Sequence, residues 1–489
     1  MSDNYETIIE TGPSPNLFGL VVGIVAFVLM LLYFEVEGLG DSAELVAAIA
    51  VLMAIWWATE AIPLSVTALL PIVLFPVLGI SSPVAAAAPY ANPIIFLFLG
   101  GFLVALAIER CGLHKRIALF IFGYIGNSGA QLVGGFMLVA ALLSMWISNT
   151  STTLMLFPIA MSISWVVEET TTDMSKKAIH EFSIALLLGL AYGASIGGIA
   201  TLVGTPTNVF MAGFLQSEYG IEIPFAKWMM VGLPATLILL PVGWLLLTRV
   251  LFKVNFASST ETKKLLNDRL MALGAMSSAE KRTAILFALL IVGWVFRKQI
   301  STQLGLTGLN DTGVAMLAAL LAFVIPSGTD EKALVAWEDT RRLPWGVLIL
   351  FGGGLSLASA LSSTGLTLWL GQLLAPLGAM NQLVLIVALT ALVVFLTELT
   401  SNVATTATLL PVMAALAVQM GVDPLIYVVP VTLAASCAFM LPVATPPNAI
   451  VFSSGQLNIT DMMRAGLGLN IFAIFLLSVI ALYLVPLIL

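Results

Sequence analysis

Two short polar clusters interrupt long apolar stretches of this chain, and both are rich in oxygen and amide groups. They are Ser148-Asn149-Thr150-Ser151-Thr152-Thr153 and Ser401-Asn402-Val403-Ala404-Thr405-Thr406. Hydroxyl groups, asparagine carbonyl oxygens and free backbone carbonyls suit a hard cation such as sodium. Backbone N–H groups at the start of a helix suit a carboxylate. One turn of chain can therefore hold a cation and an anion together.

Two proline-containing segments have a related chemistry: Gly204-Thr205-Pro206-Thr207-Asn208 and Ala444-Thr445-Pro446-Pro447-Asn448. Proline removes a helical hydrogen bond and frees a carbonyl four residues earlier, so each segment indicates a break in an apolar helix. The freed carbonyls are further oxygen ligands. The alternative is that the serine, threonine and asparagine residues only cap helices at solvent-exposed loops.

The composition places these motifs in a lipid bilayer. Of 489 residues, 60% are hydrophobic and 9% are charged, whereas about a quarter of a soluble protein is charged. The 26 acidic residues outnumber the 19 lysine and arginine residues, which leaves no basic surplus for nucleic acid. Cys111, Cys437, His114 and His180 have no disulfide, zinc-site or catalytic spacing. We therefore expect a multi-pass membrane protein that is not an enzyme.

Each membrane-spanning helix needs about 20 apolar residues, which gives a scale for dividing the chain. The segments are an N-terminus with a leading span (1–42), a first block (43–252), a polar and basic linker (253–282) and a second block (283–489). The first 16 residues carry acidic and no basic side chains, unlike a secretory signal, so we expect the leading span to be retained. The linker is expected to form a cytoplasmic helix.

Two apolar stretches, 129–166 and 380–420, are too long for one span, and each has a polar cluster in its middle. If both fold back as hairpins and the N-terminus is cytoplasmic, 16 of the 19 basic residues lie inside and 3 outside. If both cross once, 7 lie inside and 12 outside, against the positive-inside rule. We therefore predict 11 transmembrane helices plus two re-entrant hairpins, with the C-terminus outside.

The two blocks repeat each other. A shift of 253 positions lays Ser148-Asn149 on Ser401-Asn402, and a shift of 240 lays Thr205-Pro206 on Thr445-Pro446. Each copy has five spans, an odd number, so the copies are inverted, and inverted repeats place ligands near the membrane midplane on broken helices. The alternative is chance recurrence of glycine and proline in membrane helices.

The predicted fold class is an all-α polytopic membrane protein with two inverted repeats of five spans and broken helices at the midplane. Repeat 1 is divided into scaffold spans 43–110, hairpin 129–166, broken helix 183–213 and span 229–252. Repeat 2 is divided into scaffold spans 283–362, hairpin 380–420, broken helix 424–453 and span 464–488.

Charge in these segments is scarce. The hairpins and broken helices contain no lysine or arginine, so an anion bound there is expected to find no fixed positive side chain. Helix ends supply only about half a charge each, so cations must bind with a dianion. Glu398 is the only acidic residue in these segments. It is either a proton carrier or a structural carboxylate bonded to nearby hydroxyls.

These paired motifs, each followed by Thr-Pro in the next broken helix, resemble the divalent-anion/sodium symporter family over nearly the whole chain. The resemblance implies a homodimer in the cell membrane that moves succinate, malate, fumarate or citrate with sodium ions by an elevator motion. It implies substrate contacts with Asn149, Thr150, Ser401, Asn402, Thr205, Pro206, Thr445 and Pro446. It implies two groups of sodium ligands, Ser144, Ser148, Asn149 and Gly204, and Thr397, Thr400, Asn402 and Ala444.

One position departs from the family pattern. Val403 stands where the second motif would have threonine, so one hydroxyl contact is missing and the preferred acid stays open. The alternatives to a sodium-coupled carboxylate transporter are a sodium-independent dicarboxylate exchanger, a sulfate carrier and a proton-coupled anion carrier that uses Glu398.

Overall fold

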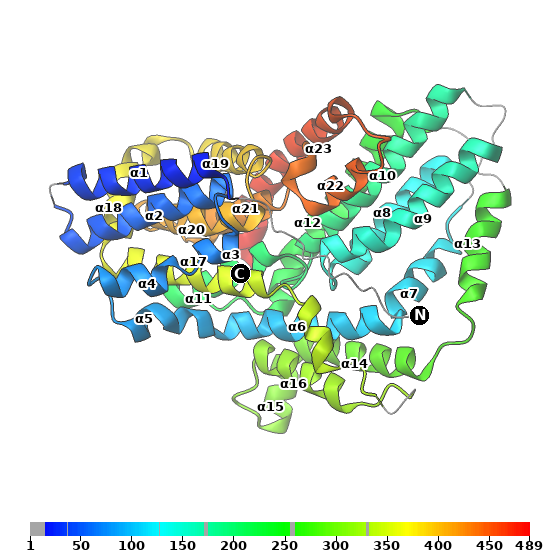
Figure 1. Cartoon of the computed structure of the whole chain (residues 1–489), viewed down its shortest axis with the longest axis horizontal. Coiled ribbons are helices and arrows are strands. Elements are labelled where there is room, and N and C mark those ends of the chain that lie inside the picture. The colour runs from blue at the N-terminus through cyan, green and yellow to red at the C-terminus, as the bar shows by residue number, and fades with distance from the viewer. Residues whose placement is uncertain (1–14, 37, 127, 171–174, 255–259, 329–331) are drawn as a thin grey trace, which may run out of the picture.

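The computed structural model describes residues 15–36, 38–126, 128–170, 175–254, 260–328 and 332–489. Within these ranges the chain is helical, and its strand-like contact is one isolated bridge between Pro326 and Ala333. The all-α prediction is confirmed (Figure 1). Residues 1–14, for which a cytoplasmic location is predicted, and residues 255–259 of the linker lie outside the described residues.

The leading span and the first scaffold spans form short and long helices. They are α1 (Leu17–Tyr33), α2 (Asp41–Thr59), α3 (Leu64–Thr67), α4 (Leu70–Val77), α5 (Pro83–Ala87), the 3-10 turn η1 (Ala88–Ala91), α6 (Pro93–Cys111) and α7 (Leu113–Phe122). One apolar run, 63–80, is split into α3 and α4, because Pro71 has no amide hydrogen to donate to the carbonyl of Thr67. The amphipathic helix α7 has no counterpart among the predicted spans.

Both long apolar stretches are divided at their polar clusters. The first forms α8 (Gly129–Ser144) and α9 (Asn149–Thr170), and the second forms α19 (Gln382–Leu396) and α20 (Asn402–Gln419). Both predicted broken helices are interrupted at Thr-Pro. The first comprises α10 (Lys176–Ile199) and α11 (Pro206–Tyr219), and the second comprises α21 (Leu425–Ala435), η5 (Pro442–Ala444) and α22 (Pro446–Phe452).

The remaining helices link and flank these elements. They are α12 (Phe225–Leu245) with the π-helical turn η2 (Leu246–Leu251), α13 (Thr260–Ala272), α14 (Ser278–Val295), α15 (Arg297–Leu304), α16 (Asp311–Val324), η3 (Trp337–Arg342), α17 (Trp345–Ser363), α18 (Leu366–Leu374), η4 (Ala375–Ala379), α23 (Ile459–Val479), the π-helical turn η6 (Ile480–Leu484) and α24 (Val485–Ile488). The linker helix is α13, which is shorter than the predicted linker because α14 already begins at Ser278.

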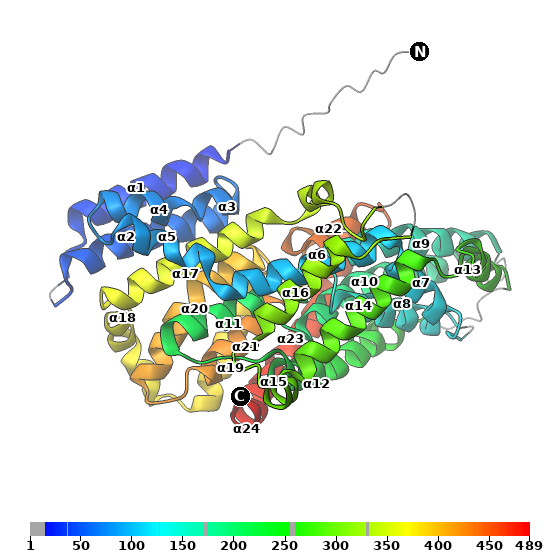
Figure 2. The same cartoon turned by 90° about the horizontal axis from the view of Figure 1, so that it is seen from below.

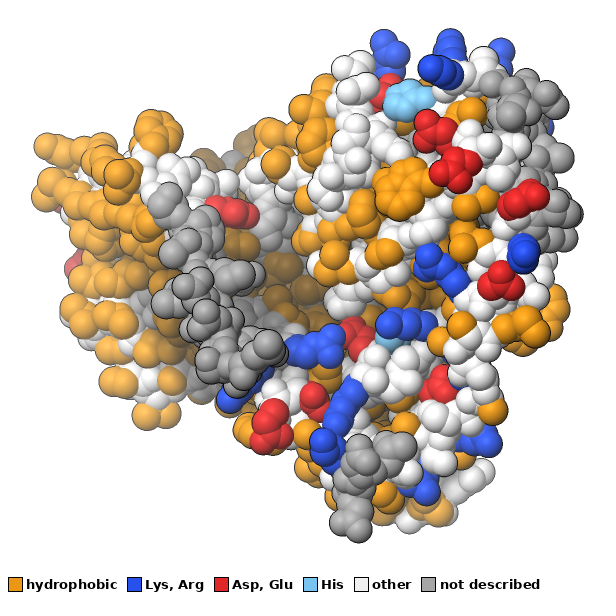
Figure 3. All heavy atoms as spheres, turned by 45° about the vertical axis from the view of Figure 1, so that its right-hand side comes forward, with side chains coloured by type: hydrophobic (Ala, Val, Ile, Leu, Met, Phe, Trp, Pro, Cys, Tyr) orange, Lys and Arg blue, Asp and Glu red, His pale blue; other side chains and the backbone are white. Residues whose placement is uncertain are grey.

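In the described part of the chain, eight helices are long and apolar enough to cross a membrane, and α14 with α15 forms a ninth candidate bent by 82°. Several expected spans are shorter helices, such as α16 with 14 residues. The protein is therefore an all-helical membrane protein, whereas the count of 11 spans stays a prediction. Figure 3 shows hydrophobic side chains covering the lobe on the left, as a lipid-facing surface requires.

Helix α10 is surrounded by its neighbours, since the whole of its most apolar stretch is buried. Its glycines allow a very close approach of α8. A β-carbon on Gly193 would lie 2.6 Å from the carbonyl oxygen of Met137, and one on Gly197 would overlap the backbone of Ala141. Small residues at such spacing let membrane helices pack backbone to backbone. This packing holds the end of α8 beside the end of α10, where the candidate site lies.

Two arginines fasten the linker to the first repeat. One is Arg269 of α13, whose Nη2 donates to Ser162 Oγ of α9 at 2.9 Å. The Arg116 side chain on α7 donates to the Glu280 carboxylate at 2.6 Å and to the carbonyl oxygens of Leu273 and Gly274, just after α13. The end of α13 and the start of α14 are thus tied to α7. In Figure 2, α7, α13 and α14 lie on the same side of the molecule.

The predicted topology can be tested with single cysteines. Lys177 and Lys264 are exposed, and both are predicted to be cytoplasmic, whereas the exposed Lys298 is predicted to lie outside. In a background without Cys111 and Cys437, cysteines at 177 and 264 should resist an impermeant thiol reagent added to intact cells. A cysteine at 298 should react under the same conditions, and inverted vesicles should reverse the pattern. Labelling at only one of positions 177 and 264 would contradict the hairpin assignment.

Candidate functional site

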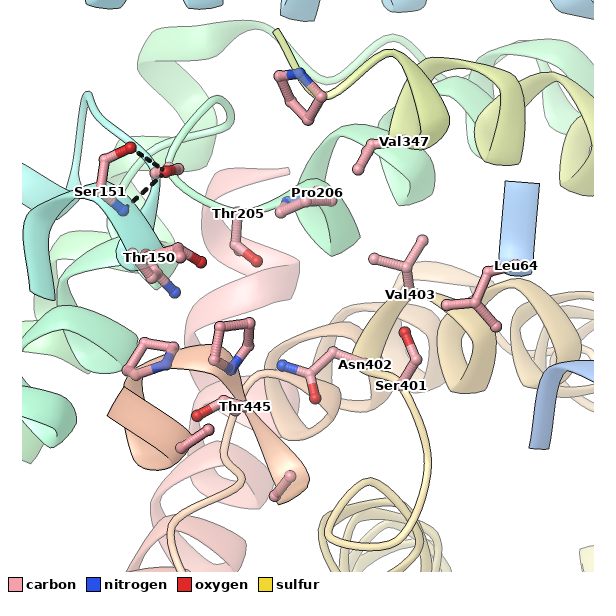
Figure 4. Close-up of a pocket in the computed structure, with 18 of the residues that line it drawn as sticks. Leu64, Thr150, Ser151, Thr205, Pro206, Val347, Ser401, Asn402, Val403 and Thr445 are labelled. Carbon is pink, nitrogen blue, oxygen red and sulfur yellow. Dashed lines mark hydrogen bonds between the residues drawn. The ribbon is translucent and has the colours of Figure 1, made fainter. Parts of the chain in front are cut away.

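A cavity of about 1160 Å³ lies between the two polar clusters and the two proline breaks. In Figure 4, Thr150, Thr205, Asn402 and Thr445 surround one space from different sides. The cavity is lined by all the residues that the family resemblance assigns to substrate binding: Asn149, Thr150, Ser401, Asn402, Thr205, Pro206, Thr445 and Pro446. Residues more than 290 positions apart in the sequence are therefore brought together here.

The tip between α8 and α9 is organised around Asn149. The hydroxyl of the buried Ser144 donates to Asn149 Oδ1, and Thr153 Oγ1 donates to the Asn149 carbonyl oxygen at 2.8 Å. Ser148 precedes the first residue of α9, and its hydroxyl oxygen accepts from the amide of Ser151 at 3.1 Å. The side chain of Asn149 is thus fixed by α8 while its backbone begins α9.

The tip between α19 and α20 repeats this arrangement. Thr397 Oγ1 donates to Asn402 Oδ1 at 2.7 Å, and Thr406 Oγ1 donates to the Asn402 carbonyl oxygen at 2.7 Å. Each partner lies 253 positions after its counterpart in the first tip. The internal repeat found in the sequence is therefore also a repeat of hydrogen bonds.

The two breaks also match. Asn208 Nδ2 donates to the carbonyls ten and seven residues earlier, at 3.4 and 2.8 Å. Asn448 Nδ2 donates to the carbonyls at the same two offsets, at 3.2 and 3.0 Å. These two asparagines are fully buried and bridge the breaks, and their amides satisfy carbonyls that an unbroken helix would have used.

The predicted sodium ligands lie around both tips. Six of them line the cavity: Ser148, Asn149, Gly204, Thr400, Asn402 and Ala444. Ser144 and Thr397 are completely buried behind it and contact the two tip asparagines. A β-carbon placed on Gly198 would lie 2.7 Å from Asn149 Oδ1 and 3.0 Å from the Gly204 carbonyl oxygen. These two oxygens therefore converge on one place, which only glycine at 198 leaves open.

Two helix starts at the cavity have no side-chain cap. Ser401 precedes α20 and Thr205 precedes α11, and neither side chain caps its helix. The amides of a first helical turn have no partner within the helix, and they carry the positive end of the helix dipole. Both starts can therefore hydrogen-bond an anion such as a carboxylate.

The charge of the cavity differs from the expectation in one respect. Arg342, at the end of η3, lines it, so a fixed positive side chain is present after all. The sequence did not predict this contact, because Arg342 lies outside the hairpins and broken helices. Arg342 Nη2 lies 3.2 Å from Glu109 Oε2, and Glu60 also lines the cavity. With two glutamates and one arginine, the described lining carries a net negative charge, so an anion still needs bound cations.

Glu398 lies behind the second tip and is 3% exposed. Its carboxylate accepts from the amides of Phe439, Met440 and Leu441 at 2.7 to 3.0 Å, and from Asn470 Nδ2 at 2.8 Å. These contacts favour the structural interpretation of Glu398, and its partners are amides rather than the expected hydroxyls. In the first repeat the corresponding break is held differently, by Thr201 Oγ1, which donates to the Met145 carbonyl at 2.5 Å.

The two tips differ in what covers them. Trp146, in the first tip, stacks on Trp294 of α14 with ring centroids 6.5 Å apart and on Phe225 of α12 at 6.0 Å. Its counterpart in the second tip, Leu399, is 69% exposed and lines the cavity. One tip is thus packed against neighbouring helices while the other faces open space.

The chain is similar to known proteins over nearly its whole length. A family model described as the sodium:sulfate symporter transmembrane region matches residues 14–489. The sodium-dependent dicarboxylate transporter SdcS of Staphylococcus saprophyticus is 41% identical over 475 residues, covering 96% of this chain and 92% of the relative. SdcS of Staphylococcus aureus strain USA300 is 40% identical over 480 residues, covering 97% and 92%.

Two solved structures share the fold at low sequence identity. MtrF of Neisseria gonorrhoeae, described among antimetabolite efflux pumps, has 14% identity and a TM-score of 0.58, covering 94% of each chain. The YdaH transporter of Alcanivorax borkumensis has 13% identity and a TM-score of 0.54, covering 80% of this chain and 86% of that chain. At such identities the likeness shows the fold alone.

The role of Glu398 can be tested by Glu398→Gln. Glutamine has one acceptor oxygen where the carboxylate has two, so at least one buried amide loses its partner, which costs about 1–3 kcal/mol. The purified variant should unfold at a lower temperature than the wild type, and Glu60→Gln, at the open cavity wall, should not. Unchanged thermal stability together with loss of pH-dependent uptake would instead identify Glu398 as a proton carrier.

Proposed function

The chain belongs to the sodium:sulfate symporter family, and from this premise we propose that it carries a di- or tricarboxylate across the membrane together with sodium ions. It is a transporter rather than an enzyme, as its relatives are. The observation that carries the proposal is the cavity bounded by two equivalent tips, each with an asparagine held in the same way.

In the proposed site, one sodium ion binds beside each tip. Ser144, Ser148, Asn149 and Gly204 supply oxygens at the first tip, and Thr397, Thr400, Asn402 and Ala444 supply them at the second. The convergence of Asn149 Oδ1 and the Gly204 carbonyl beside Gly198 supports the first site. The matched contact from Thr397 to Asn402 supports the second. Hydroxyl, amide and carbonyl oxygens are the ligands that a hard cation prefers.

The substrate carboxylates bind between the tips. We assign them to Asn149, Thr150, Ser401, Asn402, Thr205, Pro206, Thr445 and Pro446, which line one cavity. The uncapped starts of α20 and α11 support this assignment, because their amides are free to donate to carboxylate oxygens. The lining has more acidic than basic side chains, so a dianion binds only with the sodium ions beside it. Coupling thus follows from electrostatics.

Val403 sets the shape of one wall. Its side chain lines the cavity at the place where the second motif of the family has a hydroxyl group. An apolar wall there offers no hydrogen bond to the substrate. The choice among succinate, malate, fumarate and citrate therefore depends on the remaining contacts of the two tips.

The proposed transport cycle uses 11 spans, two re-entrant hairpins and a homodimer in which the tips move as a unit past a fixed scaffold. The asymmetry of the tips supports this elevator motion, because Trp146 is packed while its counterpart Leu399 is exposed. Glu60, Glu109 and Arg342, which line the cavity, all lie on the cytoplasmic side of the predicted topology. We infer that the cavity opens inward and that Trp146 becomes exposed when it opens outward.

The dependence on sodium is tested by uptake into proteoliposomes. Labelled succinate and citrate should accumulate when a sodium gradient is imposed, because the negative cavity cannot hold a dianion alone. Replacing sodium by choline should abolish accumulation, and sodium alone should stabilise the protein against heat by linkage. Equal uptake in lithium, potassium and choline would instead favour a sodium-independent exchanger.

The two tips are tested by Asn149→Ala and Asn402→Ala. Each removes an amide that can give an oxygen to a cation and an N–H to a carboxylate. Each loss of about 1–3 kcal/mol should lower sodium-dependent uptake by about fivefold to more than a hundredfold.

Three matched variants separate the site from the fold. Asn267→Ala, on the exposed surface of α13, should leave uptake unchanged and should not lower stability. Asn208→Ala and Asn448→Ala should lower thermal stability, because their amides bridge the breaks. Near-normal uptake by either tip variant would contradict a site shared between the two tips.

A further inference from the structure

A second cavity, of about 410 Å³, adjoins the first. It lies among α6, α7 and the two helices of the first hairpin, and it shares Glu109, Ser151 and Arg342 with the main cavity. Its volume falls in the range of about 300–1,000 Å³ that is typical of small-molecule sites. Ser151 connects the two cavities structurally, because its hydroxyl accepts a hydrogen bond from Ser148 of the first tip at 3.0 Å.

The charge of the second cavity is opposite to that of the first. Its described lining contains Lys115 and Arg342 but only one acidic residue, Glu109. His114 also lines the second cavity, and its pKa reflects this positive charge. Burial lowers the pKa of His114, and the positive charges of Lys115 and Arg342 lower it further. The second cavity therefore favours an anion without the help of bound cations.

An unused hydrogen-bond donor lies behind the same wall. Thr152 lines the second cavity and is 2% exposed, and its hydroxyl has no hydrogen-bond partner among the described residues. The corresponding residue of the second repeat, Thr405, does have one, since its hydroxyl lies 2.6 Å from Thr400 Oγ1. Buried hydroxyl groups normally have a partner, but the oxygen of Thr152 is itself covered, so this hydroxyl lies behind the wall of the second cavity rather than in it.

We propose that the second cavity is a sodium-independent subsite that holds the dicarboxylate between the cytoplasm and the main site. This inference rests on the proposed function and on the predicted topology, which place Lys115 and Arg342 inside. One carboxylate is held by Lys115, which lines the second cavity. The other competes with Glu109 for Arg342, whose pairing distance of 3.2 Å and 60% exposed side chain leave it free to exchange partners.

Arg342 links the subsite to the main cavity. It is the one basic residue in the described lining of both cavities, so it can contact the substrate before and after the transfer between them. The main cavity then adds the sodium ions that its negative lining requires. In this proposal the second cavity attracts the dianion, and the main cavity couples its binding to sodium.

The test is equilibrium binding of labelled succinate to the purified full-length protein, with and without sodium. In sodium-free choline buffer the wild type should show weak binding that falls as ionic strength rises. Lys115→Gln should weaken this binding by about fivefold, the upper range for one exposed charge contact.

Control variants separate the subsite from the main site. Lys177→Gln removes a fully exposed lysine from the same predicted side and should leave sodium-free binding unchanged. Asn402→Ala should also leave it unchanged, while weakening the tighter binding that appears with sodium. Lys115→Gln should retain that tighter, sodium-dependent binding.

The outcomes distinguish the two proposals. Sodium-free binding that is absent, or that Lys115→Gln does not weaken, overturns the subsite even when sodium-dependent binding is intact. Wild-type protein without any sodium-dependent binding overturns the proposed function instead. Displacement of sodium-free succinate equally well by sulfate would overturn the assignment of this cavity to the dicarboxylate.

Discussion

A helix interrupted inside a bilayer leaves backbone carbonyl and amide groups that water cannot reach, and every one of them needs a partner within the protein. The organisation of this molecule depends on that constraint. Asn208 and Asn448 bridge the two breaks in the same way, each donating to carbonyls ten and seven residues earlier. Glu398 accepts from three further amides behind the second break. The starts of α11 and α20 have no side-chain cap, and their amides are the groups that we propose for the substrate.

Close packing of backbones keeps these interruptions in register. Gly193 and Gly197 bring α10 against α8 so closely that a β-carbon at either position would collide with the opposing backbone. The end of α8 carries Ser144, and the end of α10 leads into the break that contains Gly204. Small residues in the core of the bundle therefore decide where the oxygen atoms of the first tip meet those of the first break. The apolar interior and the polar site are two consequences of the same packing.

Electrostatics divides the polar region into two parts. The main cavity has an acidic majority, which makes an anion dependent on sodium, whereas the adjoining cavity has a basic majority. Arg342 and Glu109 belong to both and are paired with each other at 3.2 Å. The backbone amides at the helix starts can also attract an anion through the helix dipole, and they place no charged side chain in the membrane. In the proposed site, this charge balance lets the substrate bind strongly only when the cations are present, which would couple substrate to sodium.

Much of this followed from the sequence alone, because each inference used a local pattern. Apolar runs fixed the class of fold, polar clusters in overlong runs placed the tips, and Thr-Pro placed the breaks. The matched motifs of the two repeats identified Asn149 and Asn402 as equivalent, and their hydrogen bonds repeat accordingly. Contacts between distant segments were not accessible in this way. Arg342 at the cavity, the amide partners of Glu398 and the stacking of Trp146 on Trp294 all join residues far apart in the chain. Spacing and residue type carry no information about such contacts, since only the packing of the helices decides which distant side chains meet.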